Sequence, residues 1–218
     1  RYYFAAKLNN RVEDLDFHLD DFVTRVNSDL IGKIVNIASR CAGFINKRFK
    51  GQLSASIVNP ELFDQFTAAH NTICDAYENR EFSRAVREIM AWADSANQYI
   101  NQAQPWVVAK DKDREDELQA ICSLGLNLFR ILMIWLAPIV PGLAQRSAEF
   151  LQCPIGTGTP LASVNQPLIS HQIGPFKRLM DRIEPSTAAA IMENFKVTDE
   201  KQDGQNSPGH LSDDPIAD

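Results

Sequence analysis

Apolar side chains recur every three or four residues along most of the chain. The clearest stripe, between about Asp20 and Lys50, consists of Val23, Val26, Leu30, Ile34, Ile37, Cys41 and Ile45. This spacing places the side chains on one face of an α-helix, which predicts a helix with one buried face. We expect Asp20 or Asp21 to cap its start, and Gly51 to end it just after Lys50.

A second set of residues follows the same rhythm on a neighbouring face of the predicted helix. Its members are Lys33, Asn36, Arg40, Gly43 and Lys47. Side chains one residue apart on a helix are rotated by about 100°, so this face lies beside the buried one. It would offer amide, guanidinium and ammonium groups outward.

The same periodicity predicts further helices, with proline or serine near several of their starts. They are expected over 60–78, 82–103, 114–136 and 141–152, and a shorter helical piece is expected over 175–196. Residues 153–166 contain several glycines and prolines and indicate a crossing loop. Strict alternation of apolar and polar residues is hard to find, so we predict an all-α fold, a helical bundle.

The most apolar stretch runs from Leu124 to Val140, but Asn127, Arg130 and Pro138 interrupt it. A membrane-spanning helix needs about 20 residues with few or no charges, so a buried bundle helix is the better interpretation. The chain begins without methionine, which suggests a piece of a larger protein, and its N-terminus does not support a signal peptide.

The cysteines are far apart and form no C-x-x-C pair. They are Cys41, Cys74, Cys122 and Cys153. This pattern excludes the usual zinc and redox motifs and indicates reduced thiols in a cytoplasmic protein.

Charge is distributed unevenly along the 218 residues. The formal net charge is −6, but residues 197–218 contain six acidic residues and one lysine, which leaves the body at −1. We expect residues 1–196 to form the folded domain and 197–218 a disordered acidic tail or linker. Between Leu30 and Pro60 the chain carries five basic residues and no acid. Such a local basic stripe can bind phosphate despite the negative total.

No catalytic or metal-binding constellation is visible. The histidines His18, His70, His171 and His210 form no metal-binding doublet. Paired acids such as Asp20 and Asp21 are typical of a helix start rather than of a general acid and base. We therefore expect that this chain is not a complete enzyme.

Features suited to recognition are clearer. Asn36 and Arg40 lie one helical turn apart and point together, while Lys47 and Arg48 add positive charge further along. Trp106 follows Pro105, whose ring stiffens the backbone after a predicted helix. The indole could pack in the core, or it could stack on an unpaired RNA base; the sequence leaves both open.

Several segments, taken in order, resemble the anticodon domain of bacterial methionyl-tRNA synthetases. They are Val35–Phe49, Glu78–Phe82, Ala85–Met90, Gln104–Lys110, Cys122–Arg130 and Pro175–Leu179. The opening Arg1-Tyr2-Tyr3 resembles the segment after the KMSKS loop of class I synthetases. The resemblance covers residues 1–196, and it implies that 1–19 are a remnant of the connection to a catalytic domain.

The resemblance implies roles for matched positions. The family binds the anticodon CAU through an Asn and an Arg on the first long helix and through a Pro-Trp pair, which here are Asn36, Arg40, Pro105 and Trp106. Lys33, Lys47 and Arg48 would contact the tRNA backbone, and Arg182 would lie near the catalytic domain.

The resemblance also implies what this chain lacks. The HIGH and KMSKS motifs, the Rossmann core and the zinc-binding insert are absent, so we expect no catalysis and no cofactor here, with ATP, Mg²⁺ and zinc serving the parent ligase. The implied partners are tRNA(Met), including the initiator, and the chain's own catalytic domain. We expect a monomeric fragment, whereas many bacterial members dimerise through a C-terminal OB-fold.

Three other functions are compatible with a helical bundle. The first is a protein-interaction bundle without RNA binding. The second is a small helical enzyme that uses His171 or His18. The third is a DNA-binding module, which the missing helix-turn-helix spacing disfavours.

Overall fold

The computed structural model describes residues 1–11, 16–156, 159, 161–188 and 190. The chain divides into two compact units, Arg1–Arg182 and Ile183–Asp218. In the second unit, residues 185–188 are helical. The predicted disordered tail, 197–218, lies outside the described residues.

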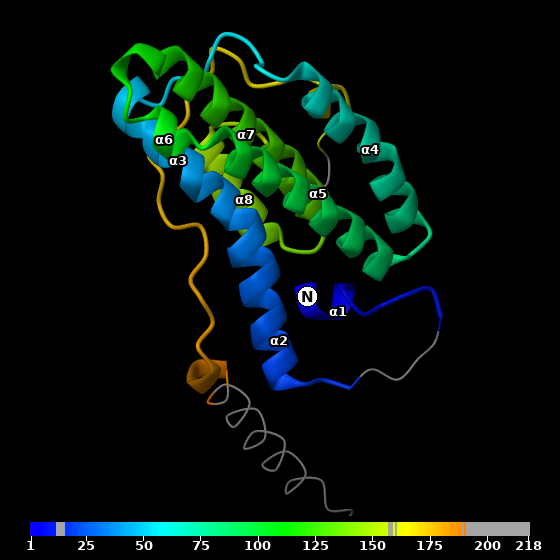
Figure 1. Cartoon of the computed structure of the whole chain (residues 1–218). Helices are drawn as coiled ribbons and strands as arrows, with labels where there is room; N and C mark the ends of the chain where they lie inside the picture. Colours follow the sequence, from blue (N-terminus) through cyan, green and yellow to red (C-terminus); the bar gives the residue numbers. More distant parts are fainter. Residues whose placement is uncertain (12–15, 157–158, 160, 189, 191–218) are drawn as a thin grey trace, which may run out of the picture. The chain divides into compact units, whose positions relative to one another are not determined.

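The first unit is built from helices (Figure 1). These are α1 (Tyr2–Ala5), α2 (Leu19–Arg25), the π-helix η1 (Val26–Val35), α3 (Asn36–Phe49), α4 (Pro60–Glu78), α5 (Phe82–Ala103), α6 (Pro105–Val108), the 3₁₀ turn η2 (Lys112–Arg114), α7 (Glu115–Leu136), α8 (Pro141–Leu151) and α9 (Leu161–Val164). Among the described residues, β pairing is confined to one isolated bridge between Gln52 and Gln172. The all-α prediction is confirmed.

The predicted first long helix is confirmed as α2, η1 and α3 in continuous succession. Its predicted cap is wrong, because the helix begins at Leu19 after His18. Asp20 and Asp21 instead lie in the first turn, where the helix dipole favours carboxylates. After the helix, Gly51 adopts a φ of +84°, and a Cβ there would lie 2.7 Å from the backbone oxygen of Ile173. The chain needs glycine at this point.

The central helix is α7, which packs most extensively against α3 and α5. A Cβ at Gly125 would lie 2.6 Å from Cys41 Sγ, so the missing side chain lets α7 approach α3 closely. The stretch Lys112–Leu136 is long and apolar enough to cross a membrane, but 89% of its most apolar window is buried within the fold. The predicted buried bundle helix is therefore observed.

Polar residues interrupt the apolar sequence of α7 because they bond the backbone of segments that pack against it, including the end of α9 and the loops around residues 54 and 168. The side chain of Ser123 accepts a hydrogen bond from the backbone of Ser54. Asn127 bonds both backbone groups of Leu168, and Arg130 donates to the backbone oxygens of the segment 163–166. The three side chains are spaced by four and three residues, so they lie on one stripe of α7.

The helix predicted over 175–196 is wrong for residues 175–184, which are not helical. Side chains of α3 and α8 engage their backbone instead. Asn46 accepts from Phe176 N at 2.8 Å and donates to Gly174 O at 3.1 Å. Arg146 Nε donates to Leu179 O at 2.6 Å. Backbone groups bonded in this way are not available for helical hydrogen bonds. Residues 189 and 191–196 lie outside the described part.

A buried indole fixes the protonation state of His70. Trp135 is 2% exposed, and its Nε1 donates to His70 Nδ1 at 3.0 Å. Because Nδ1 accepts, the ring is neutral and carries its proton on Nε2, which faces Cys74 Sγ at 3.4 Å. Burial lowers the pKa of His70 below its usual 6.5.

We expect the free energy of unfolding to fall as the pH drops below about 6.5. In that range the unfolded chain binds a proton at His70, whereas the folded chain resists it. Urea unfolding at pH 7.5 and 5.5 measures the effect. His70→Gln, which can still accept from Trp135, should show a smaller difference between the two pH values. An equal difference in both proteins would assign the pH dependence to other groups.

Candidate nucleic-acid interface

Three polar pairs join the long helix to α5 in register. They are Lys33 with Asp94 at 2.7 Å, Asn36 with Asn97 at 3.1 Å, and Arg40 with Asn101 at 2.7 Å. Each pair joins residues 61 positions apart, so the two helices run in the same direction and in step. We refer to these six residues as the polar ladder.

The middle pair is the most constrained. Asn97 Nδ2 donates to two backbone oxygens, those of Lys33 at 3.0 Å and Ala93 at 2.9 Å. Its Oδ1 accepts from Asn36 Nδ2. Both amides are half-buried, so their hydrogen bonds are partly shielded from water.

The ladder ends at an exposed indole. The guanidinium carbon of Arg40 lies 4.7 Å from the centroid of the Trp106 ring, within the range of a cation–π contact. Trp106 is 40% exposed, so core packing does not account for it. Gln104 ends α5 in a left-handed conformation, and buried Pro105 begins α6. This sharp turn carries the indole to Arg40 of α3.

The predicted basic stripe is partly neutralised. Lys33 pairs with Asp94, while Arg48 bonds the Glu115 carboxylate and, at 2.6 Å, the backbone oxygen of Ala109. Exposed Lys47 pairs with no residue in the described part of the chain. The stripe had no acid in its own segment, but the fold brings acids to it from α5 and α7.

Arg182 lies in the non-helical segment, contrary to the predicted helical placement. With Phe176 and Met180 it lines a surface depression that also includes Asn36 and Ser39 of α3. The depression therefore borders the ladder. A contact of Arg182 with a catalytic domain stays a prediction.

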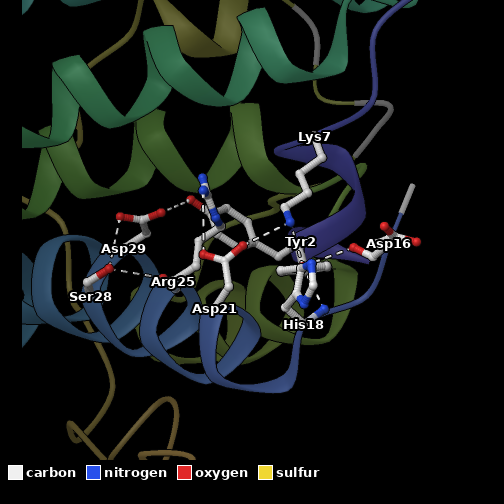
Figure 2. Close-up of polar contacts among 9 residues, drawn as sticks. Tyr2, Lys7, Asp16, His18, Asp21, Arg25, Ser28 and Asp29 are labelled. Atoms are coloured by element: carbon white, nitrogen blue, oxygen red, sulfur yellow. Dashed lines mark hydrogen bonds and ion pairs between the residues drawn. The ribbon is translucent and has the colours of Figure 1, made fainter. Parts of the chain in front are cut away.

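A second polar network anchors α1 to the start of the long helix (Figure 2). Tyr2 Oη donates to Asp29 Oδ2 at 2.8 Å, and burial together with Asp29 raises the pKa of Tyr2. Lys7 Nζ bonds Tyr3 Oη at 2.6 Å and lies 2.9 Å from Asp21. These bonds raise the pKa of Lys7, and the bond from Lys7 lowers that of Asp21. The network fixes the helix that leads into the ladder.

One of the two histidines named for the enzyme alternative has a structural role. His171 Nε2 lies 2.7 Å from the backbone oxygen of Leu151, so it serves as a structural donor. The described part contains no group of three His, Cys, Asp or Glu side chains that could hold a metal ion. None of the four cysteines forms a disulfide, and two of them, Cys41 and Cys122, are buried.

Sequence reasoning named the long-helix side of the ladder and missed its partners on α5. Asp94, Asn97 and Asn101 are spaced by three and four residues, which is a helical stripe visible in the sequence. Only the arrangement of the two helices shows that this stripe faces Lys33, Asn36 and Arg40.

Two family models match this chain, and between them the matched ranges include both sides of the ladder. A family model described as the anticodon binding domain of methionyl tRNA ligase matches residues 54–158. A second, described as tRNA synthetases class I (M), matches residues 1–42. Asn36 and Arg40 fall within the second match, and their partners and Trp106 fall within the first.

Solved structures of Mycobacterium tuberculosis methionyl-tRNA synthetase share the fold. The free form has a TM-score of 0.73 at 19% identity and covers 84% of this chain and 38% of its own. The form bound by methionyl-adenylate has a TM-score of 0.67 at 19% identity and covers 74% and 33%. This chain thus spans well under half the length of these relatives.

Proposed function

Because this chain belongs to the methionyl-tRNA synthetase family of class I ligases, we propose that Asn36, Arg40, Pro105 and Trp106 bind the CAU anticodon of tRNA(Met), including the initiator. The intact ligase would use this contact to place the distant acceptor end at its catalytic domain for ATP-dependent methionylation. Alone, this chain would recognise tRNA without catalysing the reaction.

The contact between Arg40 and Trp106 carries the proposal. An exposed indole offers a face on which an unpaired base can stack, and stacking on an aromatic side chain is worth about 1–3 kcal/mol per base. The guanidinium beside it has only donors, which suit the two acceptors, O2 and N3, on the edge of cytosine. Pro105 is buried while Trp106 is exposed, so the backbone that carries the indole is anchored in the fold.

Phosphate contacts would fall chiefly to Lys47. Lys33 and Arg48 already have anionic partners, whereas Lys47 has none among the described residues. Contacts to phosphates would set the register of the RNA without choosing its sequence.

The parent ligase would use ATP and Mg²⁺ and hold zinc in another part of the protein. We propose that none of these is held by this chain. We propose a cytoplasmic location, a monomeric state for this chain and dimerisation of the parent through a further C-terminal domain.

A fluorescence titration with two anticodon stem-loops tests the proposal. One stem-loop carries CAU and the other GAU, and both are measured at low and moderate salt. We expect tighter binding and stronger tryptophan quenching by CAU, with weaker binding of both at higher salt. Equal, salt-sensitive binding would reduce the interface to phosphate attraction, and no binding would favour the protein-interaction bundle.

A further inference from the structure

We propose that Asn97 is a specificity-determining positioning residue that locks the side-chain amide of Asn36 in one orientation. Through this lock, Asn36 would accept an anticodon base with an exocyclic amino group and reject its keto counterpart. The inference rests on the proposed function, in which Asn36 faces the anticodon.

The orientation of the Asn97 amide is fixed by its partners. Its Nδ2 group lies 3.0 Å from Lys33 O and 2.9 Å from Ala93 O, and both partners are backbone oxygens that can only accept. Turning this amide by 180° would set its own oxygen against two carbonyl oxygens and lose both bonds. Its Oδ1 therefore faces Asn36.

The fixed amide of Asn97 determines the orientation of Asn36. Because Asn97 presents an acceptor, Asn36 must offer Nδ2, and the two atoms lie 3.1 Å apart. Asn36 Oδ1 accepts no hydrogen bond from the residues that the structure describes. The oxygen and one remaining N–H are thus left for a ligand, in a fixed order.

The order of donor and acceptor distinguishes the bases. Cytosine places an amino donor beside an acceptor nitrogen, N3, whereas uracil places a carbonyl acceptor beside an N3–H donor. Adenine and guanine differ in the same way at their Watson–Crick edges. A free amide can match either order by turning about its last bond, but a locked amide matches only one.

In the other two pairs of the ladder, the long-helix side chain cannot exchange donor and acceptor by turning. Lys33 and Arg40 carry donors only, so Asp94 and Asn101 can restrain their positions but cannot change what they offer to RNA. Among the three long-helix members of the ladder, only Asn36 can present donor and acceptor in two different orders.

The test compares the wild-type chain with Asn97→Ala in binding to three stem-loops. These carry CAU, UAU with the first base changed from amino to keto, and CGU with the second base changed likewise. The wild type should prefer CAU over one changed stem-loop by at least about tenfold, since a mismatched amide leaves polar groups unpaired. In Asn97→Ala the ratio between the affinities for CAU and for that changed stem-loop should fall to about threefold or less. The fall should come mainly from tighter binding of the changed stem-loop. The affinity for CAU itself should change by no more than about threefold. The stem-loop that shows the narrowing identifies the base that Asn36 reads.

Two further variants separate positioning from a general effect on the fold. Gln98→Ala removes the exposed neighbouring amide on α5 and should leave the preference unchanged. Asn97→Asp has nearly the same size but sets a carboxylate oxygen against the carbonyls of Lys33 and Ala93, so its side chain should turn away and the preference should narrow as in Asn97→Ala. This result would tie the preference to the two donors of Asn97 rather than to its volume.

Three outcomes would overturn the inference. The first is an unchanged preference in Asn97→Ala, and the second is a loss of preference that is as large in Gln98→Ala. Both would leave the proposed anticodon interface standing. The third is equal binding of all three stem-loops by the wild type, which would overturn the proposed function as well.

Discussion

Replacing Trp106 with alanine is expected to weaken binding of the CAU stem-loop by about 10- to 100-fold. The variant loses a stacking surface worth about 1–3 kcal/mol per base. It also removes the ring beneath the Arg40 guanidinium, 4.7 Å from its centroid, and so frees the group expected to read the base edge. The dissociation constant of the stem-loop measures the loss.

The same substitution should change stability very little. Trp106 is 40% exposed, whereas Pro105 and Val108 are the buried residues of α6. We expect the thermal midpoint to shift by no more than about 2 °C, as for an exposed position in a domain of this size.

Val107→Ala is the matched control for this prediction. Val107 is the next residue on α6 and is 42% exposed, so its truncation removes exposed apolar surface without touching the Arg40 contact. It should bind the stem-loop as the wild type does. Equal affinity of Trp106→Ala and the wild type would refute the stacking role, and a fall of about 8 °C or more in the midpoint would give the indole a structural one.

The helices were predictable where local signals mark both ends. The predicted bounds 60–78 and 82–103 coincide with α4 and α5. Asn59 caps α4 by accepting from Leu62 N, and Pro60 occupies the first turn. Pro105 disfavours a helical conformation at Gln104, where α5 ends. Such signals act within a few residues and can be recognised in the sequence alone.

The non-helical segment after α9 could not be predicted because its conformation depends on distant side chains. Asn46 bonds the backbone of Gly174 and Phe176, about 130 positions later in the chain. Nothing within residues 175–184 indicates that their backbone will be bonded by other helices. The periodic pattern there therefore predicted a helix that does not form.

The candidate site also contains features that the local sequence predicts and features that depend on the packing of distant helices. Asn36 and Arg40 are one turn apart on one helix, so their common face was predictable, and Pro105 marked a stiff junction beside Trp106. The contact between Arg40 and Trp106, and the pairing of Asn36 with Asn97, join positions more than 60 residues apart. They depend on α5 running in step with the long helix, and helix packing of that kind is not encoded in local periodicity.

Replacing Asn127 with leucine is expected to lower the free energy of unfolding by about 3–5 kcal/mol. Asn127 is 1% exposed, and its side chain accepts from Leu168 N at 2.7 Å and donates to Leu168 O at 3.1 Å. Leucine is similar in size, so the loss comes from leaving both backbone groups unpaired, each at about 1–3 kcal/mol. The measurement is urea unfolding followed by circular dichroism.

The damage from Asn127→Leu should also reach the end of α3, because the segment that Asn127 holds pairs with the chain that follows this helix. Ile173 N donates to Gly51 O and Leu53 N donates to His171 O, both at 2.9 Å. Releasing Leu168 should therefore weaken the backbone pairing between residues 171–173 and residues 51–53, which follow α3. Gln98→Leu, an equivalent change at an exposed amide, should stay within about 0.5 kcal/mol of the wild type. A loss below about 1 kcal/mol in Asn127→Leu would mean that water replaces the amide at Leu168, and the polar stripe of α7 would then not be what holds this segment in place.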